Sequence, residues 1–251
     1  MLHGAKEIMG LSIAATDGEF GTVKDLYFDD ARWTVRYLVV DTGGWITGRD
    51  VLIPVNALGS ADWPVGIVHV NLAREQIRNS PGIDADKPVS RQHEAGLYQH
   101  YRYPYYWTGP QLWGDAVYPV PVDPSNVPER PHRSDAVDMT AANSDPHLRS
   151  CKEVIGYRIQ ATDDTVGHVE DFLIDEMNWS IQLIAVDTRN WWPGKEVLVS
   201  PERIERVSWS EKKVAVDISR GAVESSPEYD PANPPPPPRH DMYRRAGMPR
   251  A

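Results

Sequence analysis

The feature that most constrains the fold is an internal repeat. Residues 8–84 match residues 154–230 at a constant offset of 146 without a gap, and 24 of the 77 positions are identical. The identical positions include a loop motif, which is Val40-Asp41-Thr42 in the first copy and Val186-Asp187-Thr188 in the second. A match this extended indicates a duplicated domain. Each copy has about 75–80 residues, which is enough to fold around a core of its own.

Within each copy, apolar and polar residues mostly alternate, which is typical of strands. In the first copy this pattern predicts strands at residues 12–16, 21–28, 33–41, 51–54 and 67–72, followed by a short helix at 73–79. In the third strand we expect Trp33, Val35, Tyr37 and Val39 to share one face. Many short strands joined by tight turns predict a small antiparallel barrel, because an open sheet of this size leaves unpaired edges. The expected fold class is therefore all-β, with two small antiparallel barrels in tandem and a few short helices.

The rest of the chain differs in composition from the two copies. Residues 85–150 hold a dense aromatic run and then proline-rich stretches, and residues 231–251 hold a proline run followed by arginines. Such compositions are typical of extended or disordered chain. The predicted organisation is a first barrel at 5–84, a long irregular linker at 85–150, a second barrel at 151–230 and a disordered tail at 231–251.

Two motifs of the second copy resemble the PRC-barrel domain. The first runs from Gly156-Tyr157 through Ala161-Thr162-Asp163 and Gly167-His168-Val169-Glu170-Asp171-Phe172 to Asp175, and the second is Val186-Asp187-Thr188-Arg189-Asn190-Trp191 with Gly194-Lys195. The resemblance covers both copies and is stronger in the second. This family is similar to the cytoplasmic domain of the photosynthetic reaction-centre H subunit and to the C-terminal domain of a ribosome-maturation factor. The resemblance implies a small β-barrel that works through protein contacts, and it implies no catalytic residues.

Composition narrows the function further. The formal net charge is −10, which disfavours direct binding to nucleic acid because phosphate contacts need Lys and Arg. Cys151 is the single cysteine, so an internal disulfide and a thiolate zinc cage are excluded, as in proteins of a reducing cytoplasm. We see no signal peptide and no apolar run near the length of a membrane span. The sequence therefore predicts a cytoplasmic protein without a transmembrane segment.

Recurring carboxylates and a histidine are candidates for catalysis or metal binding. Three aspartates of the first copy recur in the second, namely Asp25, Asp29 and Asp41 as Asp171, Asp175 and Asp187. Recurrence in both copies favours a structural role at strand ends, where carboxylates accept backbone N–H bonds. His168 and Glu170 share a strand face, but two ligand groups are fewer than the three or four of a zinc site. We therefore predict no catalytic residues, no metal and no cofactor.

Two other groups of residues are candidates for binding. Tyrosine and tryptophan serve well in protein contacts, so we predict a partner-binding segment made of Tyr98, Tyr101, Tyr103, Tyr105, Tyr106, Trp107 and Trp113. The alternative is that these rings pack against the barrels and hold them together. The loop end of the second copy is a candidate ligand pocket, formed by Asp187, Arg189, Asn190 and Trp191.

The functional hypothesis is a non-catalytic protein-binding or scaffolding module with an unidentified protein partner. One alternative is an H-subunit-like protein associated with a photosynthetic membrane complex. Another is an enzyme or small-ligand binder that uses the pocket near Asp187 and Trp191. Because duplicated domains often keep an isologous contact, we expect the two barrels to pair with pseudo-twofold symmetry. Homo-oligomer formation stays open.

Overall fold

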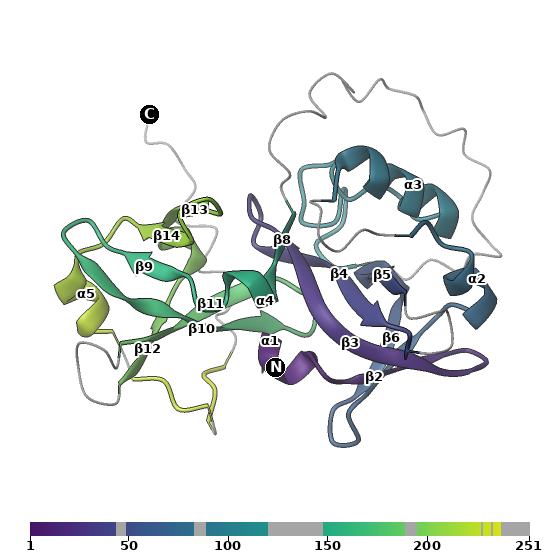
Figure 1. The fold of residues 1–251 in the computed structure, drawn as a ribbon, viewed down its shortest axis with the longest axis horizontal. Coiled ribbons are helices and arrows are strands. Elements are labelled where there is room, and N and C mark those ends of the chain that lie inside the picture. The colour runs from purple at the N-terminus through teal and green to yellow at the C-terminus, as the bar shows by residue number, and fades with distance from the viewer. Residues whose placement is uncertain are drawn as a thin grey trace. The chain divides into compact units, whose positions relative to one another are not determined.

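The chain folds into two compact units, each built on one β-sheet (Figure 1). The computed structural model describes residues 1–43, 49–82, 89–119, 148–188, 195–226, 228–231 and 233–236. One unit holds Ala5–Val154, and the other holds Met1–Gly4 together with Ile155–Ala251. Each sheet has seven strands, and the helices are few and short. The predicted all-β class with two barrel copies in tandem is confirmed.

The sheet of the first unit has the order β5-β4-β3-β2-β7-β6, and β8 pairs with β3. Its strands are β2 (Ser12–Ala15), β3 (Gly18–Asp29), β4 (Thr34–Asp41), β5 (Asp50–Pro54), β6 (Leu58–Asp62), β7 (Ile67–Val70) and β8 (Leu148–Ser150). Its helices are α1 (Ala5–Ile8), the 3-10 helix η2 (Val55–Ala57), α2 (Arg74–Arg78), α3 (Arg91–Tyr101) and α4 (Cys151–Val154). The pairing of β2 with β7 is parallel, and the other pairings of this sheet are antiparallel.

The sheet of the second unit repeats this order as β12-β11-β10-β9-β14-β13, and β1 pairs with β10. Its strands are β1 (Leu2–Gly4), β9 (Arg158–Gln160), β10 (Thr165–Asp175), β11 (Ile181–Asp187), β12 (Glu196–Val199), β13 (Ile204–Ser208) and β14 (Lys213–Val216). Its helices are the 3-10 helix η4 (Pro201–Arg203) and α5 (Arg220–Glu224). The two sheets therefore share one topology, as a duplicated sequence requires.

Two three-residue strands exchange places between the copies. Strand β1 precedes the first copy in the sequence, yet it pairs with β10 of the second, with Leu2 opposite Asp175. Strand β8 precedes the second copy, yet it pairs with β3 of the first, with Leu148 opposite Asp29. The two registers are identical once the offset of 146 is applied. The repeat therefore begins at residue 2. The sheet of each copy includes the short strand that precedes the other copy in the sequence.

The third predicted strand differs in detail from the structure. Trp33 lies in the turn before β4 with a φ of 49°, and its counterpart Trp179 has a φ of 59°. The ring of Trp33 stacks on Phe28 at a centroid distance of 5.4 Å. Strand β4 is buried on both faces, since the successive residues Leu38, Val39 and Val40 are all 2% exposed or less. A strand with one buried face was expected, and the second face is buried because part of the predicted linker covers it.

The predicted irregular linker contains a helix, so the expectation of a wholly irregular segment was wrong. Helix α3 begins after Ser90, whose hydroxyl accepts a bond from the backbone N–H of His93 at 3.2 Å. The helix ends before Arg102, which adopts a left-handed φ of 59°. Leu97, Tyr98 and Tyr101 bury one side of the helix. Burial of these three side chains stabilises a helix that is too short to persist alone in water.

Candidate functional site

The predicted partner-binding residues all lie in the first unit, and most of them are buried. Five have exposed fractions of 5% or less, namely Tyr98, Tyr101, Tyr103, Tyr106 and Trp113. Tyr105 and Trp107 are half-buried. We call residues 89–119 the aromatic segment. Five of its tyrosine and tryptophan rings fill the interior of the first unit, Tyr105 and Trp107 are partly exposed, and Tyr118 is 45% exposed.

The aromatic segment joins β4 through a buried carboxylate. The hydroxyls of Tyr37 on β4 and of Tyr106 both donate to Glu94 Oε1, at 3.0 Å and 2.7 Å. The rings of Tyr37 and Tyr98 meet edge to face at a centroid distance of 6.1 Å. Edge-to-face pairs add stability beyond the area that they bury. The segment is therefore fixed on the sheet by directed contacts as well as by apolar packing.

A buried arginine lies at the centre of this contact. Arg36 donates to Asp29 Oδ2 at 3.2 Å and to the carbonyl of Leu112 at 2.6 Å. Its guanidinium lies 3.9 Å from the ring centroid of Tyr106 and 4.7 Å from that of Trp113. A buried charge is tolerated only when it is paired and hydrogen-bonded. The aromatic segment therefore supplies contacts that stabilise the buried charge of Arg36. The same contacts fix the segment to β4.

Burial changes the proton affinity of the same cluster. Glu94 is 2% exposed. Desolvation raises the pKa of Glu94 to about 7, although Arg91 at 3.0 Å and the two tyrosine hydroxyls act in the opposite direction. Desolvation also raises the pKa of Tyr37 and of Tyr106 well above the ordinary tyrosine range. The tyrosines thus stay neutral donors, and Glu94 is the group of this cluster that changes charge near neutral pH.

Tyr105 and Trp107 form a stacked pair on this cluster. Their ring centroids are 4.6 Å apart and their planes differ by 18°. The guanidinium of Arg91 lies 4.4 Å from the centroid of Trp107, and the buried ring of Tyr98 meets Trp107 edge to face at 5.5 Å. Stacking and cation–π contacts restrict the rotamers of both rings. The pair is therefore held in place before any partner arrives.

Five of the six recurring aspartates accept backbone N–H bonds. Asp29, Asp41 and Asp175 do so at strand ends, as predicted, whereas Asp25 and Asp171 lie beside bulges within β3 and β10. Their donors are Leu26 and Lys152 for Asp25, Ala31 and Arg32 for Asp29, Gly43 for Asp41, Phe172 for Asp171, and Met177 for Asp175. Burial raises the pKa of Asp25, against the effect of its bonds to Ser150 and Lys152. The sixth aspartate, Asp187, belongs to a different arrangement.

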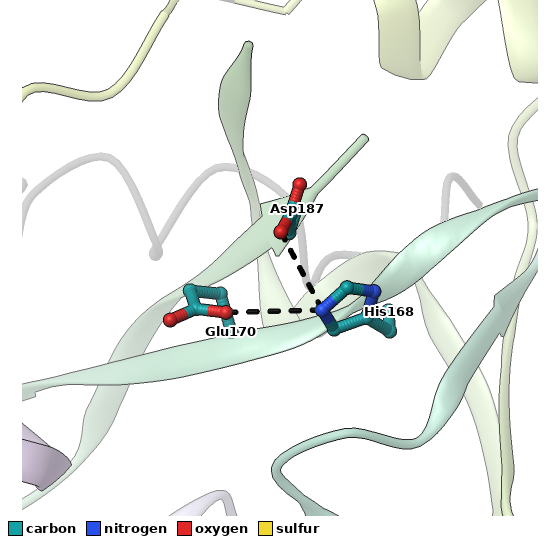
Figure 2. A group of neighbouring side chains, drawn as sticks. All are labelled: His168, Glu170 and Asp187. Atoms are coloured by element: carbon teal, nitrogen blue, oxygen red, sulfur yellow. Dashed lines mark ion pairs between the residues drawn. The ribbon is translucent and has the colours of Figure 1, made fainter. Parts of the chain in front are cut away.

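His168, Glu170 and Asp187 converge in the second unit, and Figure 2 shows the three side chains directed toward one another. His168 Nε2 lies 3.5 Å from Asp187 Oδ2 and 3.8 Å from Glu170 Oε2. We call these three residues the acid–histidine cluster. The sequence placed His168 and Glu170 on one face but missed Asp187, because its approach depends on the register between β10 and β11.

The predicted ligand pocket is only partly described. Arg189, Asn190 and Trp191 lie outside the described residues, and Asp187 belongs to the acid–histidine cluster. The neck of this loop is closed by Thr188, whose hydroxyl donates to the carbonyl of Lys195 at 2.6 Å. Thr42 makes the equivalent bond to Arg49 at 2.7 Å in the first copy. The threonine of the repeated motif therefore has a structural role in both copies.

Comparisons with known proteins agree with this topology. The sequence model of the PRC-barrel domain matches residues 2–76 and 146–223, which together make up more than half of the chain. An uncharacterized protein of Deinococcus radiodurans is 29% identical over 85 residues, which are 34% of this chain and 30% of that protein. The chain thus spans less than a third of that relative's length. Among the described residues, no helix combines the length and the apolar character needed to cross a membrane.

Proposed function

The chain belongs to the PRC-barrel domain family, and from this membership we propose that it works as a non-catalytic protein-binding module. The proposed contact surface is the outer side of the aromatic segment, centred on Tyr105 and Trp107. The observation that carries the proposal is the stacking of these two half-buried rings over a buried aromatic cluster. The other five aromatic residues of the predicted set support this surface from below.

The arrangement favours binding because the side chains of Tyr105 and Trp107 are already ordered by their contacts within the fold. Binding energy in protein interfaces concentrates in aromatic and arginine side chains held in well-packed surroundings. Trp107 packs against Tyr105, Tyr106 and Arg91. A partner that covers these rings gains apolar contact without immobilising flexible side chains.

Support for a non-catalytic role comes from the use of the carboxylates. Five of the recurring aspartates accept backbone bonds, and the single cysteine is fully buried. A single buried cysteine also fits a reducing compartment, and we propose a cytoplasmic location on that ground. The pseudo-twofold pairing of the two barrels stays a prediction.

The experiment is affinity capture from the native lysate under gentle cross-linking, with three versions of the full chain. The Y105S/W107S variant removes the two half-buried rings of the proposed surface, and the W209S variant removes a tryptophan that is 42% exposed in the second unit. We expect a partner captured by the wild type and by W209S to fall by about tenfold or more with Y105S/W107S. Equal capture by all three versions, or capture of nothing, would refute the proposed surface. Thermal unfolding of each variant separates lost binding from lost folding.

A further inference from the structure

We propose that His168, Glu170 and Asp187 form a binding site for a divalent transition-metal ion, for which Zn²⁺ is a suitable probe. One imidazole and two carboxylates supply three ligand atoms within 4.8 Å of one another. Three protein ligands leave coordination positions for water or for a group from another molecule. The inference is independent of the proposed protein-binding role, because the acid–histidine cluster lies in the other compact unit.

The fold brings the three residues together through strand register and a bulge. His168 on β10 lies directly opposite Asp187 on β11, so both side chains point to the same face of the sheet. The register shifts between Val169 and Asp171, which leaves Glu170 as an extra residue on β10. The first copy has the same bulge at Lys24, so this irregularity belongs to the repeated fold. Glu170 lies two positions after His168, so it shares this face by strand alternation, and the bulge adjusts the direction of its side chain.

The distances fit an ion of this size. With sides of 3.5 Å and 3.8 Å and a third side of at most 4.8 Å, the triangle of ligand atoms has a centre about 2.4 Å or less from each corner. Zinc takes nitrogen and carboxylate oxygen at about 2.0–2.2 Å. Side-chain movements of a few tenths of an ångström therefore complete the site, and no change of backbone is needed.

The charge of the three ligands and their solvent exposure also favour a divalent transition-metal ion such as Zn²⁺. Two carboxylates balance a divalent cation, and neutral imidazole suits zinc and the neighbouring transition metals better than Mg²⁺ or Ca²⁺. The side chain of Asp187 is 5% exposed, whereas those of His168 and Glu170 are 31% and 26% exposed. A buried carboxylate anchors the site, and the two half-buried ligands leave it open to solvent on one side.

The first copy provides an internal control. The positions of His168 and Glu170 are taken there by Thr22 and Lys24, while Asp41 replaces Asp187. The ammonium of Lys24 lies 2.8 Å from Asp50. The first copy thus carries a cation of its own beside its strand-end carboxylates.

The second copy has a carboxylate where the first copy has that ammonium. Glu170 takes the place of Lys24, and Glu196 takes the place of Asp50 and lies opposite Asp187 on β12. The face therefore gathers three carboxylates and one imidazole, and it also holds two basic residues, because Arg158 on β9 lies opposite His168 and Lys213 on β14 lies opposite Arg158.

The test is calorimetric titration of the full, tag-free chain with Zn²⁺ after treatment with a chelator. We expect one ion per chain and a higher unfolding temperature in its presence. The H168T and E170K variants copy the residues of the first copy, which folds with them, and each is expected to weaken binding by about a hundredfold or more. The H3Q variant is the matched control, because His3 also lies beside a carboxylate, Glu176 at 3.3 Å.

Retained binding in H3Q together with loss in both H168T and E170K would establish the site. Zinc binding of equal strength in H168T and E170K would place the ion elsewhere and overturn the proposal. The absence of binding by the wild type would overturn it as well. Unfolding curves of the metal-free variants, expected to match the wild type, show that lost binding does not reflect lost folding.

Discussion

At the residue scale, Glu94 connects the stability of the first unit to pH. Its pKa of about 7 in the folded chain lies above its ordinary value of 4.5, so the folded state binds the proton more tightly than the unfolded state. The free energy of unfolding therefore falls as pH rises from about 4.5 to about 7, by up to about 3 kcal/mol from this group. The E94Q variant cannot titrate and should lose less stability over this range. Urea unfolding at pH 5 and pH 8 checks this, and equal pH dependence in both proteins would contradict it.

Arg36 makes a second prediction at this scale. Its 0% exposed side chain pairs with Asp29, and removing one partner of a buried ion pair leaves the other charge uncompensated. The R36Q variant, which copies Gln182 of the second copy, should lower the free energy of unfolding by about 3–5 kcal/mol. The control is R203Q, since Arg203 and Asp217 pair at the surface at 3.4 Å. That change should cost less than about 1 kcal/mol, and a similar loss from both variants would argue against the buried role.

At the element scale, α2 and α5 differ in their caps. Ser219 precedes α5, and its hydroxyl accepts a bond from the backbone N–H of Ala222 at 3.3 Å. Ala73 holds the equivalent place before α2 and offers no side-chain acceptor. We expect S219A to lower stability by about 1 kcal/mol and A73S to raise it by a similar or smaller amount. Thermal unfolding measures both changes, and a loss of stability in A73S would contradict the role of the cap.

The elements also show what the sequence can predict. Strands β2, β3, β4, β5 and β7 and helix α2 were all expected, because each has an apolar pattern that repeats in the second copy. Strands β6 and β1 were missed, since β6 is mostly exposed and β1 has three residues that find their partner far along the chain. Helix α3 was missed because its dense aromatic composition was interpreted as irregular chain, although Glu94, Leu97, Tyr98 and Tyr101 have the spacing of a helix face. For the acid–histidine cluster, the sequence predicts that His168 and Glu170 share a face, because they are close in sequence. It does not predict Asp187, which lies opposite His168 only through the register of β10 and β11.

At the scale of the whole molecule, the exchange of β1 and β8 means that neither sheet is assembled from one continuous stretch of chain. Leu2–Gly4 completes the sheet of the second unit, although the residues that follow it belong to the first. The predicted barrels at 5–84 and 151–230 leave out both β1 and β8. Each barrel therefore lacks the short strand that completes its sheet. A barrel expressed alone from such boundaries is therefore expected to expose a strand edge on β3 or β10.

Amide hydrogen exchange tests the exchange of strands directly. In a variant that lacks residues 2–4, we expect faster exchange in residues 173–175 of β10, because these residues pair with β1. Residues 27–29 of β3 pair with β8 and should keep their protection, although they are closer to the deletion in sequence. Replacing residues 148–150 with Gly-Ser-Gly should give the reverse pattern. If the deletion instead loosened residues 27–29, each copy would be shown to complete its own sheet. The expected result would mean that the two copies have come to depend on each other for folding, so that neither can be lost without exposing the other.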